Sequence, residues 1–312
     1  MSTAGASTAG VIDTEPLERN AIRTAGLTKH YGKIVALSHL DLAVPVGAVF
    51  GYLGPNGAGK TTTIRLLMGL LRPTAGSASV LGLDATNDRE IVDRRVGYLP
   101  GDFAAYPDLT GAQYLRFLSN LRGNADWKNV TGLADRLDLD LSRHIGELSH
   151  GNRQKVGLVQ AFMHDPDLLV LDEPTTGLDP LIQREFLAMV REASGSGKTV
   201  FLSSHILAEV EAVADWVGIL RAGRLVVVET VKSLKQKAMR RLDLRFSNRP
   251  PTEALARVDG VRKIDFTGSV AHVVIEGSTA ELFRAVAPFG VENVRTYEAD
   301  LEEIFLSYYE DD

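Results

Sequence analysis

The segment GPNGAGKT, residues 54–61, has the residue types and spacing of a phosphate-binding loop, GxxxxGK[ST]. It follows the apolar run AVFGYL and precedes the helical pattern TTTIRLLMGLL, so it fits a loop between a strand and a helix. Glycines let backbone N–H groups turn toward phosphate oxygens, and a helix N-terminus favours negative charge. Lys60 is predicted to reach the β and γ phosphates of a nucleotide and Thr61 to offer its hydroxyl to Mg²⁺. A glycine-rich turn with a surface lysine is the alternative.

Two acidic residues close a second apolar run, DLLVLDEP. Residues 168–171 are predicted to be a buried parallel strand, and open α/β sheets bind ligands at the carboxyl ends of such strands. We therefore expect Asp172 to hold Mg²⁺ through its water shell. Glu173 is expected to orient or deprotonate the water that attacks the γ-phosphate. A pair of surface acids at the end of a strand is the alternative.

Two further side chains are candidates for nucleotide contacts. His205 follows the apolar run TVFLSS, where a neutral imidazole could hydrogen-bond the γ-phosphate and the attacking water. A structural histidine at a strand-to-helix turn is the alternative. Tyr31, in LTKHYGKIVAL, could offer an aromatic face to adenine or pack as a core or edge-strand tyrosine.

The elements that must position these residues alternate in type along the chain. Short apolar runs predict strands at residues 48–53, 96–100, 167–172, 199–204 and 216–220. Helical patterns separate these runs, which is typical of an α/β fold with a mainly parallel sheet covered by helices. Thr110 and Gln113 have capping-box spacing, which predicts the start of a helix in an insert at about residues 102–165.

The two ends of the chain differ from this middle part. The first 20 residues are small, polar and aperiodic, and they predict a flexible tail before an α/β domain at residues 21–229. Residues 230–312 are expected to form a small accessory domain. Its element order is βαββαβ, as in a ferredoxin-like module, and a helix at DLEEIFLSYY closes it. No catalytic constellation occurs there, so regulation or dimer contact is the expected role.

Composition limits the classes of partner. The 312 residues include 34 basic and 40 acidic side chains, a formal net charge of −6, so no nucleic-acid partner is expected. The absence of cysteine excludes disulfide and thiol chemistry. The N-terminus lacks the apolar core of a signal peptide, and no stretch reaches the ~18 apolar residues that cross a bilayer. The chain is therefore not expected to enter a membrane by itself.

Five segments, in this order and spacing, resemble the ATP-binding subunit of an ABC transporter: TKHYGKIVAL, GPNGAGKTT, LSHGN, LLVLDEPTTGLDP and the Ser-Ser-His turn. The resemblance covers about residues 22–229 and implies a P-loop NTPase cassette with a helical subdomain that binds ATP and Mg²⁺. It implies that Tyr31 stacks on adenine, that Glu173 is the catalytic base and that His205 senses the γ-phosphate. Asp172 and Thr61 would hold the metal. The implied ATP contacts are Gly54, Pro55, Asn56, Gly57, Ala58, Gly59, Lys60, Thr61 and Thr62.

The segment LSHGN is a small polar turn that opens a helix, and a helix N-terminus suits a triphosphate. Residues 54–61 already supply such an end within the chain. In the family, this segment completes the ATP site of the opposite subunit, which here implies Leu148, Ser149, His150, Gly151 and Asn152. Asp179 would lie at the dimer contact. With one phosphate loop present, the resemblance implies pairing with a second ATP-binding subunit, as a homodimer. An ordinary Ser-capped helix is the alternative.

Two positions depart from the family pattern. The commoner form of the signature is LSGGQ, so His150 and Asn152 replace a glycine and a glutamine. After the run VGYLP the family usually has a glutamine that touches Mg²⁺ and signals to the membrane partner, but Gly101 stands there. Asp102 follows and could reach the metal directly or through water, although its acidic side chain is shorter than glutamine.

The C-terminal part resembles the extension on ATPases of exporters with type-2 permeases, including antibiotic and multidrug efflux systems. This implies a subunit at the cytoplasmic face of the membrane that docks on a separate integral-membrane permease and powers export of a small amphipathic compound. The ATPase of an uptake system and a soluble ABC ATPase acting on ribosomes or DNA are the alternatives. The basic stretch at residues 232–245 could meet anionic headgroups or be a solvated linker helix.

Overall fold

The computed structural model describes residues 20–122, 126–237 and 240–297, and its first sheet is antiparallel. The strands of this sheet lie in the order β2-β1-β4-β5. They are β1 (Asn20–Tyr31), β2 (Ile34–Pro45), β4 (Ala75–Val80) and β5 (Leu83–Asp84). The predicted tail lies outside the described residues, apart from its last residue, which begins β1.

The second sheet has six strands in the order β10-β9-β3-β8-β7-β6. They are β3 (Val49–Leu53), β6 (Val96–Leu99), β7 (Leu168–Asp172), β8 (Thr199–Ser204), β9 (Trp216–Arg221) and β10 (Arg224–Thr230). Five of them are parallel and β10 is antiparallel at one edge. The five predicted strands and the mainly parallel sheet are therefore confirmed.

Both faces of this second sheet are buried, which explains why β3, β7 and β8 read as continuous apolar runs. Alternate side chains enter two different cores. Phe50 and Tyr52 pack toward the first sheet and α1, whereas Val49 and Leu53 pack toward the helical side. The surrounding helices are α1 (Lys60–Leu67), α2 (Arg89–Arg95), α6 (Pro180–Gly195), α7 (Leu207–Val213) and α8 (Val231–Lys237).

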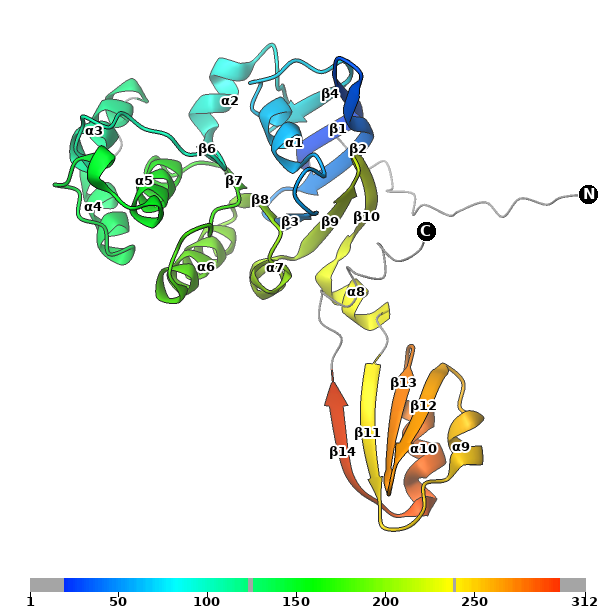
Figure 1. Cartoon of the computed structure of the whole chain (residues 1–312). Helices are drawn as coiled ribbons and strands as arrows, with labels where there is room; N and C mark the ends of the chain where they lie inside the picture. Colours follow the sequence, from blue (N-terminus) through cyan, green and yellow to red (C-terminus); the bar gives the residue numbers. More distant parts are fainter. Residues whose placement is uncertain (1–19, 123–125, 238–239, 298–312) are drawn as a thin grey trace, which may run out of the picture.

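A helical insert lies between β6 and β7 and forms a separate lobe in Figure 1. It contains α3 (Gly111–Leu121), α4 (Trp127–Arg136), the short η2 (Ile145–Glu147) and α5 (His150–Phe162). Both bonds of the predicted capping box are present. Gln113 N donates to Thr110 Oγ1 at 3.2 Å, and Thr110 N donates to Gln113 Oε1 at 2.9 Å.

The third sheet is formed by the C-terminal part of the chain, in the order β12-β13-β11-β14. Its elements are β11 (Arg240–Phe246), α9 (Thr252–Ala256), β12 (Val261–Thr267), β13 (Val270–Ile275), α10 (Ala280–Val286), η3 (Ala287–Phe289) and β14 (Val291–Tyr297). This is the order expected of a ferredoxin-like module, with a core of its own between the sheet and the two α-helices. The predicted closing helix lies outside the described residues.

Among the described helices, none has the length and apolar character that a bilayer crossing requires.

Candidate functional site

The predicted residues gather at one edge of the second sheet. Because β3, β7 and β8 are parallel neighbours, their carboxyl ends meet at that edge. The loop of residues 54–59 follows β3, Asp172 ends β7, and His205 follows β8. Residues as far apart in the sequence as Gly54 and His205 are thus brought to one place.

The phosphate-binding loop has the conformation that its glycines predict. Gly59 precedes α1 with a φ of +112°, in the left-handed region that favours glycine. A Cβ atom at this position would lie 2.7 Å from the carbonyl oxygen of Ala36 on β2. The ammonium of Lys60 is buried and donates to Gly54 O at 2.7 Å and Pro55 O at 3.3 Å. The loop therefore folds around a buried cation.

Glu173 connects this cation to the predicted histidine. Its Oε1 lies 3.2 Å from Lys60 Nζ, and its Oε2 lies 2.7 Å from His205 Nδ1. Because the carboxylate accepts, Nδ1 of His205 donates, and Nε2 is the ring nitrogen that remains for a ligand. The structure thus joins the three residues predicted to be catalytic in one chain of contacts.

Asp172 is fully buried at the end of β7. Its Oδ1 accepts from Ser203 Oγ at 2.5 Å, whereas its Oδ2 has no hydrogen-bond partner among the described residues. Gly101 faces this second oxygen, since a Cβ on Gly101 would lie 3.1 Å from Asp172 Oδ2. A buried carboxylate oxygen without a hydrogen-bond partner, next to a residue that has no side chain, fits a contact to a hydrated cation.

The donor set around Asp172 fits Mg²⁺. No group of three or more His, Asp or Glu side chains in the described part of the chain is placed to hold a metal by itself. Mg²⁺ commonly uses one or two carboxylates together with substrate phosphates and waters. Thr61, the second residue of α1, is half-buried beside Lys60 and could supply a hydroxyl.

Tyr31 and Asp102 are both exposed. Tyr31 ends β1 with 45% of its surface exposed, and Lys29 Nζ lies 5.2 Å from its ring centroid. Tyr31 is therefore not a core tyrosine. Asp102 is 98% exposed, and its Oδ2 lies 4.0 Å from Nη2 of Arg65 on α1. This position gives the metal role of Asp102 no support.

The signature segment forms the N-terminus of α5. Ser149 caps the helix, accepting from Asn152 N at 3.2 Å, and both Ser149 and His150 are exposed. Leu148 is buried in the core, so its side chain anchors the turn rather than facing a ligand. A Cβ on Gly151 would lie 2.4 Å from the carbonyl oxygen of Gly177. The signature turn therefore packs directly on the segment that follows Glu173.

Asp179 caps α6 at the end of that segment. Its Oδ1 accepts from Ile182 N at 3.1 Å and Leu181 N at 3.0 Å. These backbone hydrogen bonds, from Ile182 first, lower the pKa of Asp179. The carboxylate is exposed, and it orders the start of α6.

Three residues of the site were not predicted. The Ser203 hydroxyl contacts Asp172, as described above. Gln154 of α5 is buried and donates through Nε2 to Pro174 O at 3.2 Å and Glu173 O at 3.3 Å. Glu209 of α7 accepts from Thr175 Oγ1 at 2.6 Å, and burial raises its pKa. The sequence contained a feature that could have identified two of them. Ser203 and Gln154 are polar residues among apolar ones in a buried strand and a buried helix.

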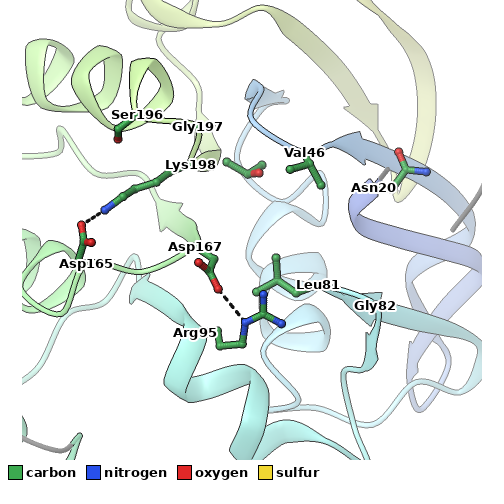
Figure 2. A pocket seen from close by; sticks show the side chains of 11 residues that line it. Asn20, Val46, Leu81, Gly82, Arg95, Asp165, Asp167, Ser196, Gly197 and Lys198 are labelled. Atoms are coloured by element: carbon green, nitrogen blue, oxygen red, sulfur yellow. Dashed lines mark hydrogen bonds and ion pairs between the residues drawn. The ribbon is translucent and has the colours of Figure 1, made fainter. Parts of the chain in front are cut away.

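A hollow of about 640 Å³ lies away from this site (Figure 2). Its lining includes Thr199, which begins β8, and Arg95, which precedes β6, so it lies at the amino-terminal edge of the sheet. An ion pair of Arg95 with Asp167, 2.7 Å, and another of Lys198 with Asp165 cross it. None of the predicted site residues lines this hollow.

Comparisons with known proteins agree with this geometry. The family described as "ABC transporter" matches residues 37–176. The daunorubicin resistance ATP-binding protein DrrA2 of Streptomyces coeruleorubidus is 36% identical over 303 residues, which cover 92% of this chain and 94% of that protein. The probable multidrug ABC transporter ATP-binding protein YbhF of Escherichia coli (strain K12) is 38% identical over 222 residues and 70% of this chain. The match spans only 38% of the length of YbhF.

A solved structure described as an ATP-binding subunit of an ABC transporter has the same fold. It superimposes with a TM-score of 0.65 and 31% sequence identity. The superposition covers 69% of this chain and 92% of that one. It therefore leaves about a third of the present chain without a counterpart.

Proposed function

Because the chain belongs to the family of ABC transporter ATP-binding proteins, we propose that it binds and hydrolyses ATP to power export of a small amphipathic compound through a separate membrane permease. The main support for ATP hydrolysis is a set of contacts at the carboxyl edge of the second sheet, where Glu173 contacts both Lys60 and His205. The names of the relatives, multidrug and daunorubicin resistance proteins, support the export part.

Each side chain of the site has a chemical task in this proposal. Lys60 and the backbone N–H groups at the start of α1 bind the β and γ phosphates, and Tyr31 stacks on the adenine. Glu173 orients the attacking water and accepts its proton, and His205 Nε2 bonds the γ-phosphate. Bound Mg²⁺, held by Thr61 and through water by Asp172, supplies charge neutralisation at the phosphates.

The signature segment supports a paired arrangement. Ser149 and the exposed N-terminus of α5 belong to the same chain as the phosphate loop, and a helix N-terminus suits a second triphosphate. We propose that they complete the ATP site of a second copy, with Asp179 at the contact. Closure of two copies around ATP would supply the conformational change that drives transport, and ATP hydrolysis would return the pair to the open state.

The helical insert is the proposed contact with the permease, which places the chain at the cytoplasmic face of the membrane. Exposed apolar side chains gather on it. Phe117 and Leu121 lie four residues apart on α3, and the ring of Tyr106 lies 6.2 Å from that of Phe117. An apolar patch of this kind, which we call the α3 patch, is typical of a protein contact.

The substitution Glu173→Gln tests the catalytic assignment. It is expected to lower ATP hydrolysis by about 10²-fold or more, because the amide cannot accept the proton of water. Binding of ATP and pairing of two chains should remain, since the side chain keeps its shape. Steady-state ATPase rates, nucleotide binding and light scattering with ATP measure the three properties. A variant that hydrolyses ATP at the wild-type rate would contradict the assignment.

Recovery of the tagged chain from native membranes in mild detergent tests the export role. A polytopic permease recovered without an extracytoplasmic binding protein is the expected result. Recovery with such a binding protein would favour uptake, and recovery with ribosomes or DNA would favour a non-transport ATPase.

A further inference from the structure

Ser203 is fully buried on β8, directly opposite Asp172 in the parallel ladder. Its hydroxyl donates to Asp172 Oδ1 at 2.5 Å and accepts from Glu173 N at 3.1 Å. The same backbone N–H of Glu173 also points at Ser203 O, 3.2 Å away. One hydroxyl group therefore contacts both of the acidic residues that the mechanism requires.

We propose that Ser203 is a positioning residue for metal-dependent ATP binding, which aims Asp172 at Mg²⁺ and holds Glu173 in its active conformation. The inference rests on the proposed ATPase function and extends it to a residue outside the phosphate loop and the acidic pair.

The two carboxylate oxygens of Asp172 have different surroundings. A carboxylate on a fully buried side chain needs partners, and Ser203 satisfies Oδ1. This bond fixes the rotation of the carboxylate, so Oδ2, which has no hydrogen-bond partner among the described residues, is the oxygen that faces Gly101. A hydrogen bond from a neighbouring side chain orients a metal-binding carboxylate, and its loss typically weakens metal affinity 10-fold to 100-fold.

The backbone of Glu173 is held in an unusual conformation. Its φ is +50°, a conformation that is unfavourable for a residue with a Cβ. Two hydrogen bonds to Ser203 on the amide side, and Gln154 Nε2 on the carbonyl side, hold it there. In this conformation the side chain lies between Lys60 and His205. Ser203 thus links the placement of the base to the placement of the metal ligand.

The test compares the affinity of the full chain for a fluorescent, non-hydrolysable ATP analogue in MgCl₂ and in EDTA. Wild-type protein should bind more tightly with Mg²⁺, and the ratio of the two affinities measures the metal contribution. In Ser203→Ala this ratio should fall about 10-fold, with the affinity in EDTA unchanged within about 2-fold. Ser203→Thr, which keeps the hydroxyl, should restore the ratio. Steady-state ATPase assays should show a matching rise in the Mg²⁺ concentration at half-maximal rate.

Thr199→Val is the matched control, because Thr199 is another buried hydroxyl residue on β8. Its Oγ1 accepts from Gly47 N at 2.9 Å, at the opposite end of the strand. This variant should lose thermal stability but keep the wild-type affinity ratio. The proposal would be overturned if the ratio of the affinities in MgCl₂ and EDTA in Ser203→Ala stayed within 2-fold of the wild-type ratio. It would also be overturned if this ratio fell equally in Thr199→Val.

Two further outcomes have a defined meaning. If Ser203→Ala does not fold, Ser203→Cys keeps the volume with a weaker donor and carries the same expectation of a lowered ratio. If the wild-type chain gains no affinity from Mg²⁺, the proposed ATPase function fails, rather than the role of Ser203.

Discussion

At the scale of single residues, this site relies on three buried polar side chains. Asp172 and Ser203 are fully buried, and Lys60 is 6% exposed. Buried polar groups are stabilised only where they find partners, and each of these contacts another part of the site. The exception is Asp172 Oδ2, which has no hydrogen-bond partner among the described residues and is the oxygen that we propose faces Mg²⁺.

Substitution of Asp172 should therefore have a large effect on the ATPase rate, and substitution of Asp102 a small one. Asp172→Asn is expected to lower the ATPase rate at 1 mM Mg²⁺ by about 10²-fold, because it neutralises a buried metal contact. Asp102→Asn is expected to change that rate by less than about 2-fold, since this carboxylate is exposed and paired only loosely with Arg65.

Mg²⁺ titrations of the two variants separate these effects. Both substitutions change an acid to its amide, so each is the control for the other. An equal loss in Asp102→Asn would show that this residue takes over the role of the missing glutamine.

At the scale of elements, the parallel strands could be predicted because burial on both faces leaves uninterrupted apolar runs such as LLVL at residues 168–171. The acids that end such a run, and the glycine-rich loop after another, could be placed at the same edge. The first sheet was not among the expected strands. β1 pairs with β2 through several register shifts, so its buried positions do not alternate regularly. On β2, by contrast, the alternation of buried Leu40, Leu42 and Val44 was available in the sequence.

The contact between Ser203 and Asp172 could not be predicted for another reason. It depends on β7 and β8 being neighbours in register, with residue 172 opposite residue 203. The sequence does not state the strand order, because any of the other four parallel strands could adjoin β7. Gln154 similarly requires knowledge of which segment lies against the buried face of α5.

Arg122 and His164 are half-buried residues of the insert that contact each other and the carbonyl of Val96, the first residue of β6. Arg122, at the end of α3, donates through Nη1 to His164 Nε2 at 2.6 Å and to Asp93 O at 3.1 Å. His164 follows α5 closely. Burial, followed by the charge of Arg122, lowers the pKa of His164 to about 4. The imidazole is therefore neutral in the folded chain at neutral pH and accepts the bond.

This contact predicts acid sensitivity of stability. An unfolded histidine has a pKa of about 6.5, so between pH 6.5 and 4 the unfolded chain binds a proton that the folded chain does not. The contribution of neutral His164 to the free energy of unfolding is therefore complete above pH 6.5 and decreases as the pH falls. From this residue alone we expect the free energy of unfolding to decrease by about 2 kcal/mol between pH 7.5 and 5.

Urea unfolding followed by tryptophan fluorescence at the two pH values measures this change. His164→Gln should reduce the pH dependence, because a glutamine does not titrate. His144→Gln, a change at an exposed histidine, is the control and should leave it as in wild type. An equal pH dependence in all three proteins would contradict the assignment.

At the scale of the whole molecule, the nucleotide edge and the α3 patch (Tyr106, Phe117 and Leu121) belong to different lobes joined through α5. The N-terminus of α5 bears the signature segment, and its buried Gln154 bonds the carbonyl of Glu173. In the proposed function, this contact would couple the γ-phosphate site to the insert.

Phe117→Asp tests whether the α3 patch is the permease contact. A charge in the centre of an apolar contact should lower recovery of the permease with the tagged chain by at least 10-fold. The ATPase rate of the isolated chain should stay within about 2-fold of wild type, because Phe117 contacts none of the site residues. Val46→Asp is the matched control, an exposed apolar residue beside the hollow at the opposite edge of the sheet. Equal recovery of the permease with Phe117→Asp and wild type would place the contact elsewhere, whereas a loss of ATPase activity would show that the insert supports the site itself.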